Sequence, residues 1–421
     1  MKRYTHRAVG LWPAILLSCW TSFSAAGADL ALPQALQAAV GYSADLSANQ
    51  HQINALQNMA DSAAQLPDPQ LRFGVENVPL GGGNARRLTR EGMTMQRIGI
   101  MQTWVSGDKR EKKAQTLRAE ADSLYSNSDG IVARIQRDTA QAWLNLAFSQ
   151  RVLQDAEALV QESRRQLVPL QASAAGGGAL DGVLDARLTL AAMEDRLSDA
   201  RRDVQVAQAR IAELTGINDA VAAGALPRFE RLPADPQTLK RQLHQHPEMQ
   251  QAQREVSLAQ ARAAQSSVAA IPDVGVEMYY ARRGDEYDDM AGVMISVDLP
   301  LFTSSRQDKD HAADLSRTLE ARDRIRLTER EHLARLDTLL AQYQAAQSRW
   351  RRQHHEVLPL RQQRVTLAVT QYQSGNDTLA DVLAARRDLL DARIAAHGAG
   401  LELAQLWAAL RYLTPAQEYV Q

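Results

Sequence analysis

The sequence predicts a mainly α-helical, internally duplicated fold built on very long helices, with two strand hairpins between them. Apolar residues recur every seven positions from Asp108 to about Ser173, with Pro169 as the one strong helix breaker. A seven-residue period sustained this far indicates a supercoiled helix packed beside neighbouring helices. The chain is 45% hydrophobic but only 5% aromatic, a composition that suits long helices packing through small residues.

A short turn motif occurs twice, about half a chain apart. The stretch that begins at Ser173 matches the stretch that begins at Tyr372 without a gap, so that Gly176 aligns with Gly375 (375 minus 176 is 199). In each copy the glycine separates two patterned stretches that are typical of helix. The repeat therefore predicts a duplicated helical hairpin.

Residues 1–28 have the pattern of a signal peptide. Basic residues precede an apolar run that is too short to span a bilayer, and an A-x-A cleavage signature ends at Ala28. We favour cleavage there. The alternative is lipidation of Cys19, since Leu16–Cys19 resembles a lipobox; it is the only cysteine, so the mature chain has no disulfide.

The mature chain divides into two similar halves joined by a linker. The first half, 29–216, is predicted to contain in order a helix, a strand hairpin (69–105), a long helix, a tip turn (173–181) and a returning helix. The linker is 217–236, rich in Ala, Pro and Gly. The second half, 237–415, repeats the order, with its strand hairpin at 273–302 and its tip turn at 372–380.

Four segments alternate apolar and polar residues with the period of two that is typical of a strand, as Leu71, Phe73 and Val75 illustrate. Their length suits a tilted crossing of a bilayer, which takes ~9–11 residues. A lone four-stranded sheet would leave backbone groups unpaired in lipid, so several chains must pool their strands. With the signal peptide, this predicts an outer-membrane segment in a Gram-negative bacterium, with the polar helices extending into the periplasm.

The mature chain, from about Asp29 to Pro415, resembles the outer-membrane factor family typified by TolC. The resemblance rests on the duplicated architecture, the two tip motifs and the strand-to-helix junctions Gln102–Ala114 and Val297–Ala312. Within the family, the HPEM motif at 246–249 and the strand MISVDLPLF resemble the heavy-metal efflux branch, of which CzcC is the type.

The resemblance implies a homotrimer with a 12-stranded outer-membrane β-barrel that continues into a long, coiled-coil-like α-helical barrel. It also implies docking on a periplasmic adaptor (a membrane fusion protein) and an inner-membrane RND pump. The protein would then be the exit duct of a tripartite efflux system, with no cofactor and no enzymatic step. Heavy-metal cations are the favoured cargo, while organic compounds or drugs, and a polypeptide of type I secretion, remain open.

The resemblance also implies a gate at the helix tips, where aspartates ring the narrow end of the tunnel. By position, Tyr372 matches the tip tyrosine and Asp381 the first ring aspartate. Ala384 and Gly182 depart from the pattern, although Asp181 is adjacent to Gly182. A simpler interpretation of Asp381 is that it complements the positive start of the last helix. The predicted adaptor contacts are the turn residues Gly176, Gly177, Gly178, Gly375 and Asn376.

Other function classes have weaker support. Hydrolase, metalloprotease and nucleotide-binding motifs are absent, and a net charge of -1 argues against a nucleic-acid surface. Paired histidines at 244 and 246, and at 354 and 355, lack a third ligand nearby in the sequence, and Met93, Met95 and Met101 suit the barrel surface, so we predict no metal site. An exported coiled-coil structural protein would explain the heptads but not the two strand hairpins.

Overall fold

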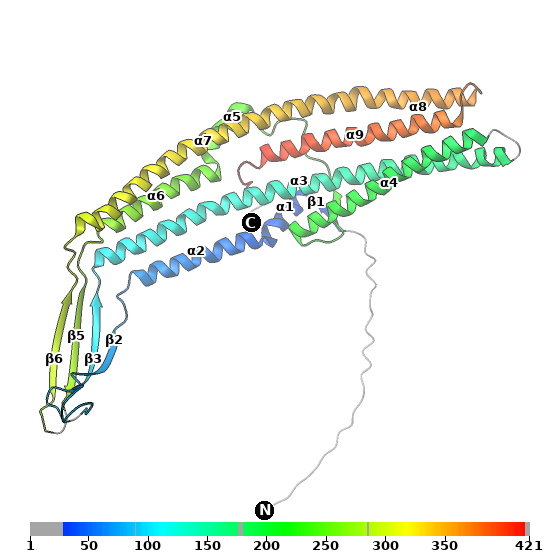
Figure 1. The fold of residues 1–421 in the computed structure, drawn as a ribbon. Coiled ribbons are helices and arrows are strands. Elements are labelled where there is room, and N and C mark those ends of the chain that lie inside the picture. The colour runs from blue at the N-terminus through cyan, green and yellow to red at the C-terminus, as the bar shows by residue number, and fades with distance from the viewer. Residues whose placement is uncertain (1–27, 89, 176–179, 284–285, 417–421) are drawn as a thin grey trace, which may run out of the picture.

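The protein is elongated, with a four-stranded sheet at one end and two helix-hairpin tips at the other (Figure 1). The computed structural model describes residues 28–416 except 89, 176–179 and 284–285, and no side chain within 170–181. The predicted fold class is confirmed: the chain is mainly helical and duplicated, and it contributes four strands. Residues 1–27, which include Cys19 and all but the last residue of the predicted signal peptide, lie outside the described part of the chain.

The described helices and strands have the following bounds. The helices are α1 (Leu32–Tyr42), α2 (Ala44–Ala63), α3 (Gly107–Ala175), α4 (Leu180–Thr215), α5 (Pro236–Gln242), α6 (Pro247–Ser267), α7 (Gln307–Arg352), α8 (Leu358–Gln373) and α9 (Leu379–Arg411). The strands are β1 (Asp29–Ala31), β2 (Gln70–Glu76), β3 (Met95–Trp104), β4 (Val221–Ala223), β5 (Val274–Arg282) and β6 (Met290–Val297). Short 3-10 turns lie at Leu243–Gln245 and Thr303–Ser305, and a π-helical turn at Gln353–Val357.

Helix α3 runs along most of the helical region. Its first half packs against α2 and α6, and its second half packs against α4 and α9 (Figure 1). Near its middle, the Trp143 side chain is buried and its indole N–H donates to the backbone oxygen of Leu30 at 2.7 Å. This bond ties β1 to the centre of α3.

The helix predicted before the first strand hairpin is divided in the structure into α1 and α2. Ser43 has an extended backbone and its hydroxyl accepts a hydrogen bond from the Leu46 N–H at 3.2 Å, so it ends α1 and caps α2. Just before α1, β1 pairs in parallel with β4, which lies inside the predicted linker. Strands of three residues are too short for a period of two to mark them in a sequence.

The linker itself packs against the helices. The Tyr343 hydroxyl on α7 donates to the backbone oxygen of Phe229 at 2.7 Å, and Gln347 donates to that of Glu230 at 2.7 Å. On the other side, the side-chain oxygen of Gln150 on α3 accepts from the Ala222 N–H at 3.2 Å. The linker is therefore a bridge that connects α3 with α7.

The second long helix keeps its direction but contains one π-helical turn between two α-helical segments (Figure 1). It consists of α7, the π-helical turn and α8. Pro359 is the second residue of α8, just after the π-helical turn; it has no N–H to donate, and its ring would clash with the carbonyl one turn earlier. A wider turn relieves that clash, and in it His354 stacks on Trp350 with the ring planes 10° apart.

The four long strands form one antiparallel sheet in the order β2-β3-β5-β6. The central pair, β3 and β5, comes from different halves of the chain, with Ile98 opposite Tyr280 and Ile100 opposite Met278. The sheet thus joins the two halves at the end opposite the tips.

Two glycines on α9 give a matched test of helix packing. A Cβ on Gly400 would lie 2.8 Å from the buried Phe148 ring, whereas one on Gly398 would meet nothing within 4 Å. We expect Gly400→Ala to destabilise the fold by about 1–3 kcal/mol through overpacking. Gly398→Ala should stabilise it by up to about 1 kcal/mol through helix propensity. Thermal unfolding of the purified protein measures both, and equal melting temperatures would contradict this packing.

Candidate functional site

The C-terminal tip turn is shaped by backbone hydrogen bonds and one glycine. Gly375 has a φ of +76° and its N–H donates to the Tyr372 oxygen at 3.1 Å, while the Asn376 N–H donates to the Gln371 oxygen at 2.9 Å. A Cβ on Gly375 would meet nothing, so the backbone angle rather than crowding requires glycine. Tyr372, in the last turn of α8, is 41% exposed.

Asp381 lies in the first turn of α9 and takes part in a capping box. The Thr378 hydroxyl accepts from the Asp381 N–H at 3.3 Å, and the Asp381 carboxylate accepts from the Thr378 N–H at 3.1 Å. Hydrogen bonds from the Thr378 side chain and then its backbone lower the pKa of Asp381. The helix-start interpretation of Asp381 is therefore correct for the single chain, and the carboxylate stays exposed and ionised at neutral pH.

The first tip turn lies partly outside the described residues. Gly176, Gly177 and Gly178 lie outside the described residues, and so does the side chain of Asp181. Helix α4 begins at Leu180, and Gly182 follows with open space around a hypothetical Cβ. The assignment of Asp181 and these glycines thus remains a sequence prediction.

Charged groups behind the tips connect the two hairpins. Asp155 on α3 accepts from Arg393 at 2.7 Å and lies 2.8 Å from the His397 ring nitrogen, both on α9. Burial alone would raise the pKa of Asp155, but the hydrogen bond from His397 and the charge of Arg393 outweigh it and lower that pKa. Nearer the tips, Arg386 is buried and its nearest acidic partner is Glu162 at 3.5 Å.

One face of the sheet is apolar and exposed. Cross-strand register puts most of the large hydrophobic side chains of the four strands on the same face. Phe73 is 83% exposed, Met278 66% and Ile295 66%. The other large exposed members of this face are Leu71, Val75, Ile98, Ile100, Trp104, Tyr280, Val293 and Val297. Only an apolar environment or a partner can remove this surface from water.

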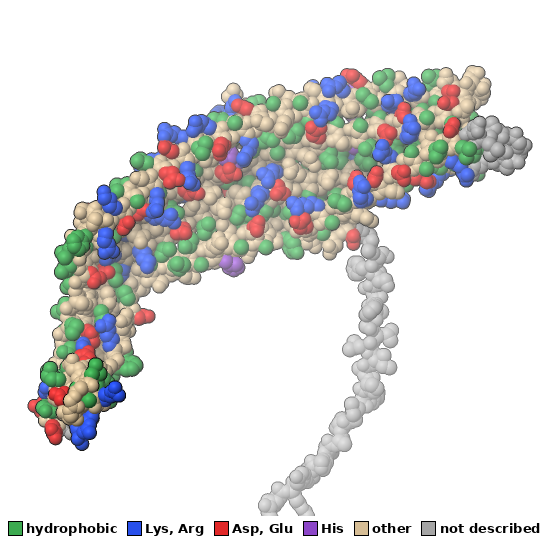
Figure 2. Space-filling model, viewed as in Figure 1, with side chains coloured by type: hydrophobic (Ala, Val, Ile, Leu, Met, Phe, Trp, Pro, Cys, Tyr) green, Lys and Arg blue, Asp and Glu red, His purple; other side chains and the backbone are tan. Residues whose placement is uncertain are grey.

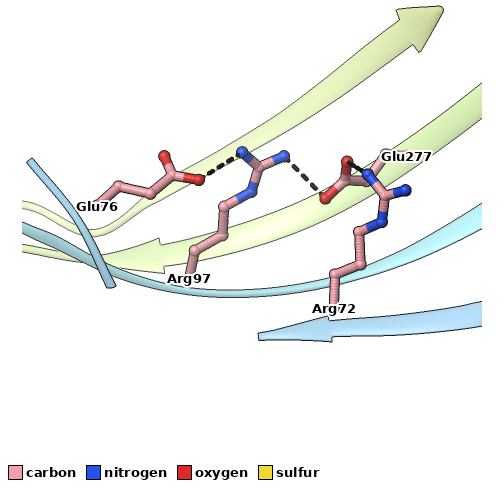
Figure 3. A network of polar contacts seen from close by, with 4 residues as sticks. All are labelled: Arg72, Glu76, Arg97 and Glu277. Carbon is pink, nitrogen blue, oxygen red and sulfur yellow. Dashed lines mark hydrogen bonds and ion pairs between the residues drawn. The ribbon is translucent and has the colours of Figure 1, made fainter. Parts of the chain in front are cut away.

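The opposite face carries a network of ion pairs. Arg97 contacts Glu76 at 3.0 Å and Glu277 at 2.8 Å, and Glu277 also contacts Arg72 at 3.4 Å (Figure 3). The Arg97 guanidinium lies 3.8 Å from the centroid of the Tyr279 ring. Glu277 is nearly buried, so two arginines neutralise a charge that would be costly to bury alone.

Sequence reasoning did not find this network. The signal was present, because Arg72, Glu76, Arg97 and Glu277 all occupy positions off the apolar face, but the pairing of β3 with β5 was needed to connect them. The same register changes the interpretation of two methionines. Met101 lies opposite Glu277, and Met95 lies opposite Glu76, so both are on the polar face rather than the apolar one.

The helical surface is polar on the side that Figure 2 shows. Lysine and arginine alternate with aspartate and glutamate over its whole length, without a large region of one sign (Figure 2). Among the described residues, none of the helices has the length and apolar character that a membrane-spanning helix needs.

Comparison with known proteins gives one consistent result. Residues 238–414 match the family model of outer membrane efflux proteins. The chain is 24% identical over 378 residues to the cobalt-zinc-cadmium resistance protein CzcC of Cupriavidus metallidurans, covering 88% of this chain and 86% of that protein. Its fold is similar to the outer membrane protein VceC of Vibrio cholerae (TM-score 0.69, 19% identity, 91% and 95% of the two chains). It is also similar to CusC (TM-score 0.71, 16% identity, 91% and 92%).

The Asp155 cluster predicts a component of stability that depends on pH. Because the pKa of Asp155 is lowered in the folded chain, its contribution is complete above the unfolded value of about 3.9 and is lost as the pH falls through the folded value. Asp155→Asn should therefore destabilise the protein at neutral pH. Below about pH 4 the variant should lose less stability with falling pH than the wild type does. Thermal unfolding between pH 3 and pH 7 measures this. A parallel decline in wild type and variant would contradict it.

Proposed function

Because the chain belongs to the outer membrane efflux protein family, we propose that it is the exit duct of a tripartite efflux system. It is an outer membrane efflux channel and not an enzyme. In the proposal it sits in the outer membrane of a Gram-negative bacterium and extends into the periplasm. There it receives cargo from a periplasmic adaptor and an inner-membrane RND pump. The observation that carries the proposal is the sheet with one exposed apolar face, placed at the end of two long helical hairpins.

The topology of the sheet supports assembly as a trimer. Among the described strands, β2 and β6 each have one free edge, and they run in opposite directions. If β6 of one copy pairs with β2 of the next, the pairing is antiparallel like the rest of the sheet. Three copies then close a ring of 12 strands with no edge left, which is the arrangement that lipid requires. The apolar face would contact lipid, and the Arg97 network would face the lumen.

Heavy-metal cations are the proposed cargo. Support comes from the similarity to a cobalt-zinc-cadmium resistance protein over most of both chains. The HPEM motif at 246–249 and the segment MISVDLPLF at 294–302 point to the same branch. A duct for organic compounds, or for a secreted polypeptide, would have the same architecture, so the cargo needs a cellular test.

The proposed aperture is at the helix tips. Three copies of Asp381 converging on an axis would produce a negative field that attracts cations, with Tyr372 beside it. The exposed carboxylate and its lowered pKa suit that role, since it stays charged at periplasmic pH. The turn residues Gly375 and Asn376, with 176–178 in the first copy, are the proposed adaptor contacts.

Deletion of the protein tests the cargo. With the partner pump expressed, we expect the deletion strain to lose tolerance to at least one of zinc, cadmium, cobalt, copper and silver, and the restored gene to recover it. Tolerance to organic toxic compounds is the control. Unchanged tolerance to all five metals would exclude the metal branch, while a new sensitivity to organic compounds would identify the alternative duct.

The aperture is tested by conductance in planar bilayers. Asp381→Asn keeps a side-chain acceptor for the capping box but removes the charge, so it should weaken block by divalent cations by about tenfold or more. Asp181→Asn should have a smaller effect, because the first copy has Gly182 where the second has Asp381. An equal effect of the two variants would reject the assignment of a principal ring at Asp381.

A further inference from the structure

Three side chains able to bind metals meet where α6 begins. His246 and Glu248 come from the start of α6, and His332 comes from α7; one ligand atom of each lies within 4.8 Å of the others. His332 Nε2 is 2.9 Å from Glu248 Oε2, and the two imidazole centroids are 4.2 Å apart. His332 follows Glu248 by 84 positions (332 minus 248), which explains why the sequence showed no third ligand.

The local fold fixes His246 before any ion binds. It is the N-cap of α6, and its Nδ1 accepts the Glu248 N–H at 3.3 Å. Pro247 holds the residue before it in an extended conformation, which is the conformation an N-cap needs. Because Nδ1 accepts the hydrogen bond of the cap, Nε2 is the ring nitrogen that could bind a metal ion.

The cluster extends from the protein surface into the interior. His332 is 4% exposed. Burial, and then the neighbouring His332, lower the pKa of His246 to about 4, so its ring is neutral at pH 7. The hydrogen bond with His332 lowers the pKa of Glu248, so its carboxylate is charged. Two imidazoles and one carboxylate thus each offer one ligand atom within 4.8 Å of the others. The proton that His332 Nε2 shares with Glu248 would be released when an ion binds, because a metal ligand must be deprotonated.

We propose that His246, Glu248 and His332 form a binding site for a divalent transition-metal ion of the zinc, cobalt or nickel class. Imidazole and carboxylate together suit these borderline ions, whereas calcium and magnesium prefer oxygen ligands alone. Zinc–ligand distances of ~2.0–2.2 Å place tetrahedral ligand atoms roughly 3.4 Å from one another. His332 Nε2 and Glu248 Oε2, now 2.9 Å apart, would separate slightly while the more distant ligand atoms approach, and side-chain rotation supplies both movements. Water would complete the coordination.

A pocket of about 610 Å³ gives access to the cluster. Its walls come from α3, α6, α7 and the end of α9, and they include both His246 and Glu248. Three arginines also line it, and their charge opposes a cation. Arg134 is paired with Asp45 at 3.1 Å and Arg137 with Asp138 at 2.7 Å, which leaves Arg335 as the principal opposing charge. An Arg335→Gln variant should therefore bind the ion more tightly.

The consequence of binding is mechanical. The ion would add a coordinate link between the start of α6 and α7, two antiparallel helices that already pack together and share the contact between Glu248 and His332. This role is separate from transport, because the ligands come from within one chain and the site does not depend on what the duct carries.

Titration of the purified full-length protein, without a polyhistidine tag and stripped of metal, tests the site. We expect about one Zn²⁺ per chain by calorimetry, and visible absorption bands when Co²⁺ is used. His332→Gln should lower the affinity on the order of 100-fold, since loss of a ligand costs at least as much as loss of its supporting partner. His246→Asn should do the same while it preserves the helix cap. His354→Gln with His355→Gln, a pair outside the cluster, is the matched control and should bind like wild type.

Unfolding temperature separates a metal site from a purely structural cluster. Zn²⁺ should raise the melting temperature of the wild type and of the control, but not that of His246→Asn. The proposal is overturned if the wild type binds no stoichiometric metal, or if the variants bind it equally well. Loss of metal tolerance in cells is a different measurement, so failure of the cargo proposal would leave this result unchanged.

Discussion

The structure depends on one constraint, that α3 must be covered along its whole length by different partners in its two halves. Its buried positions are largely small, including Ala114, Ala140 and Ala156, so neighbouring helices approach closely and the burial is spread along the axis. On the sheet side the partners are α2 and α6, and on the tip side they are α4 and α9. Because each half of the chain supplies one partner on each side, neither half can complete its packing alone.

The sequence predicted the features that repeat and missed those that do not. Heptads located the long helices, and alternation located the four strands, because both are periodic along the chain. The break at Ser43, the pairing of β1 with β4 and the π-helical turn before Pro359 have no period. Each depends on one local feature, such as a hydroxyl that caps a helix or a proline without an N–H. The surrounding packing determines which backbone conformation results.

The polar clusters show a second limit of sequence reasoning. Asp381 was found from its motif, and its capping partner Thr378 is only three positions away. Glu277 and His332 were not found, because their partners are distant in the chain: Arg97 is brought to Glu277 by the register of β3 on β5, and His246 to His332 by the packing of α6 on α7. Local chemistry can be predicted from a sequence once a motif is recognised, whereas long-range chemistry needs the register of the elements.

The tip end and the sheet end of the molecule differ in how many of their packing partners the single chain supplies. At the tip side, the hairpins are joined within the chain by Asp155 with Arg393 and by Arg196 with Asp391 at 3.2 Å. At the sheet side, the strand edges and the apolar face have no partner among the described residues. The helical region therefore holds most of the stability of a single chain, and the sheet would gain its stability from other copies and from lipid. Under the proposed function, folding of the helices can precede insertion, and closure of the sheet is the step that couples insertion to assembly.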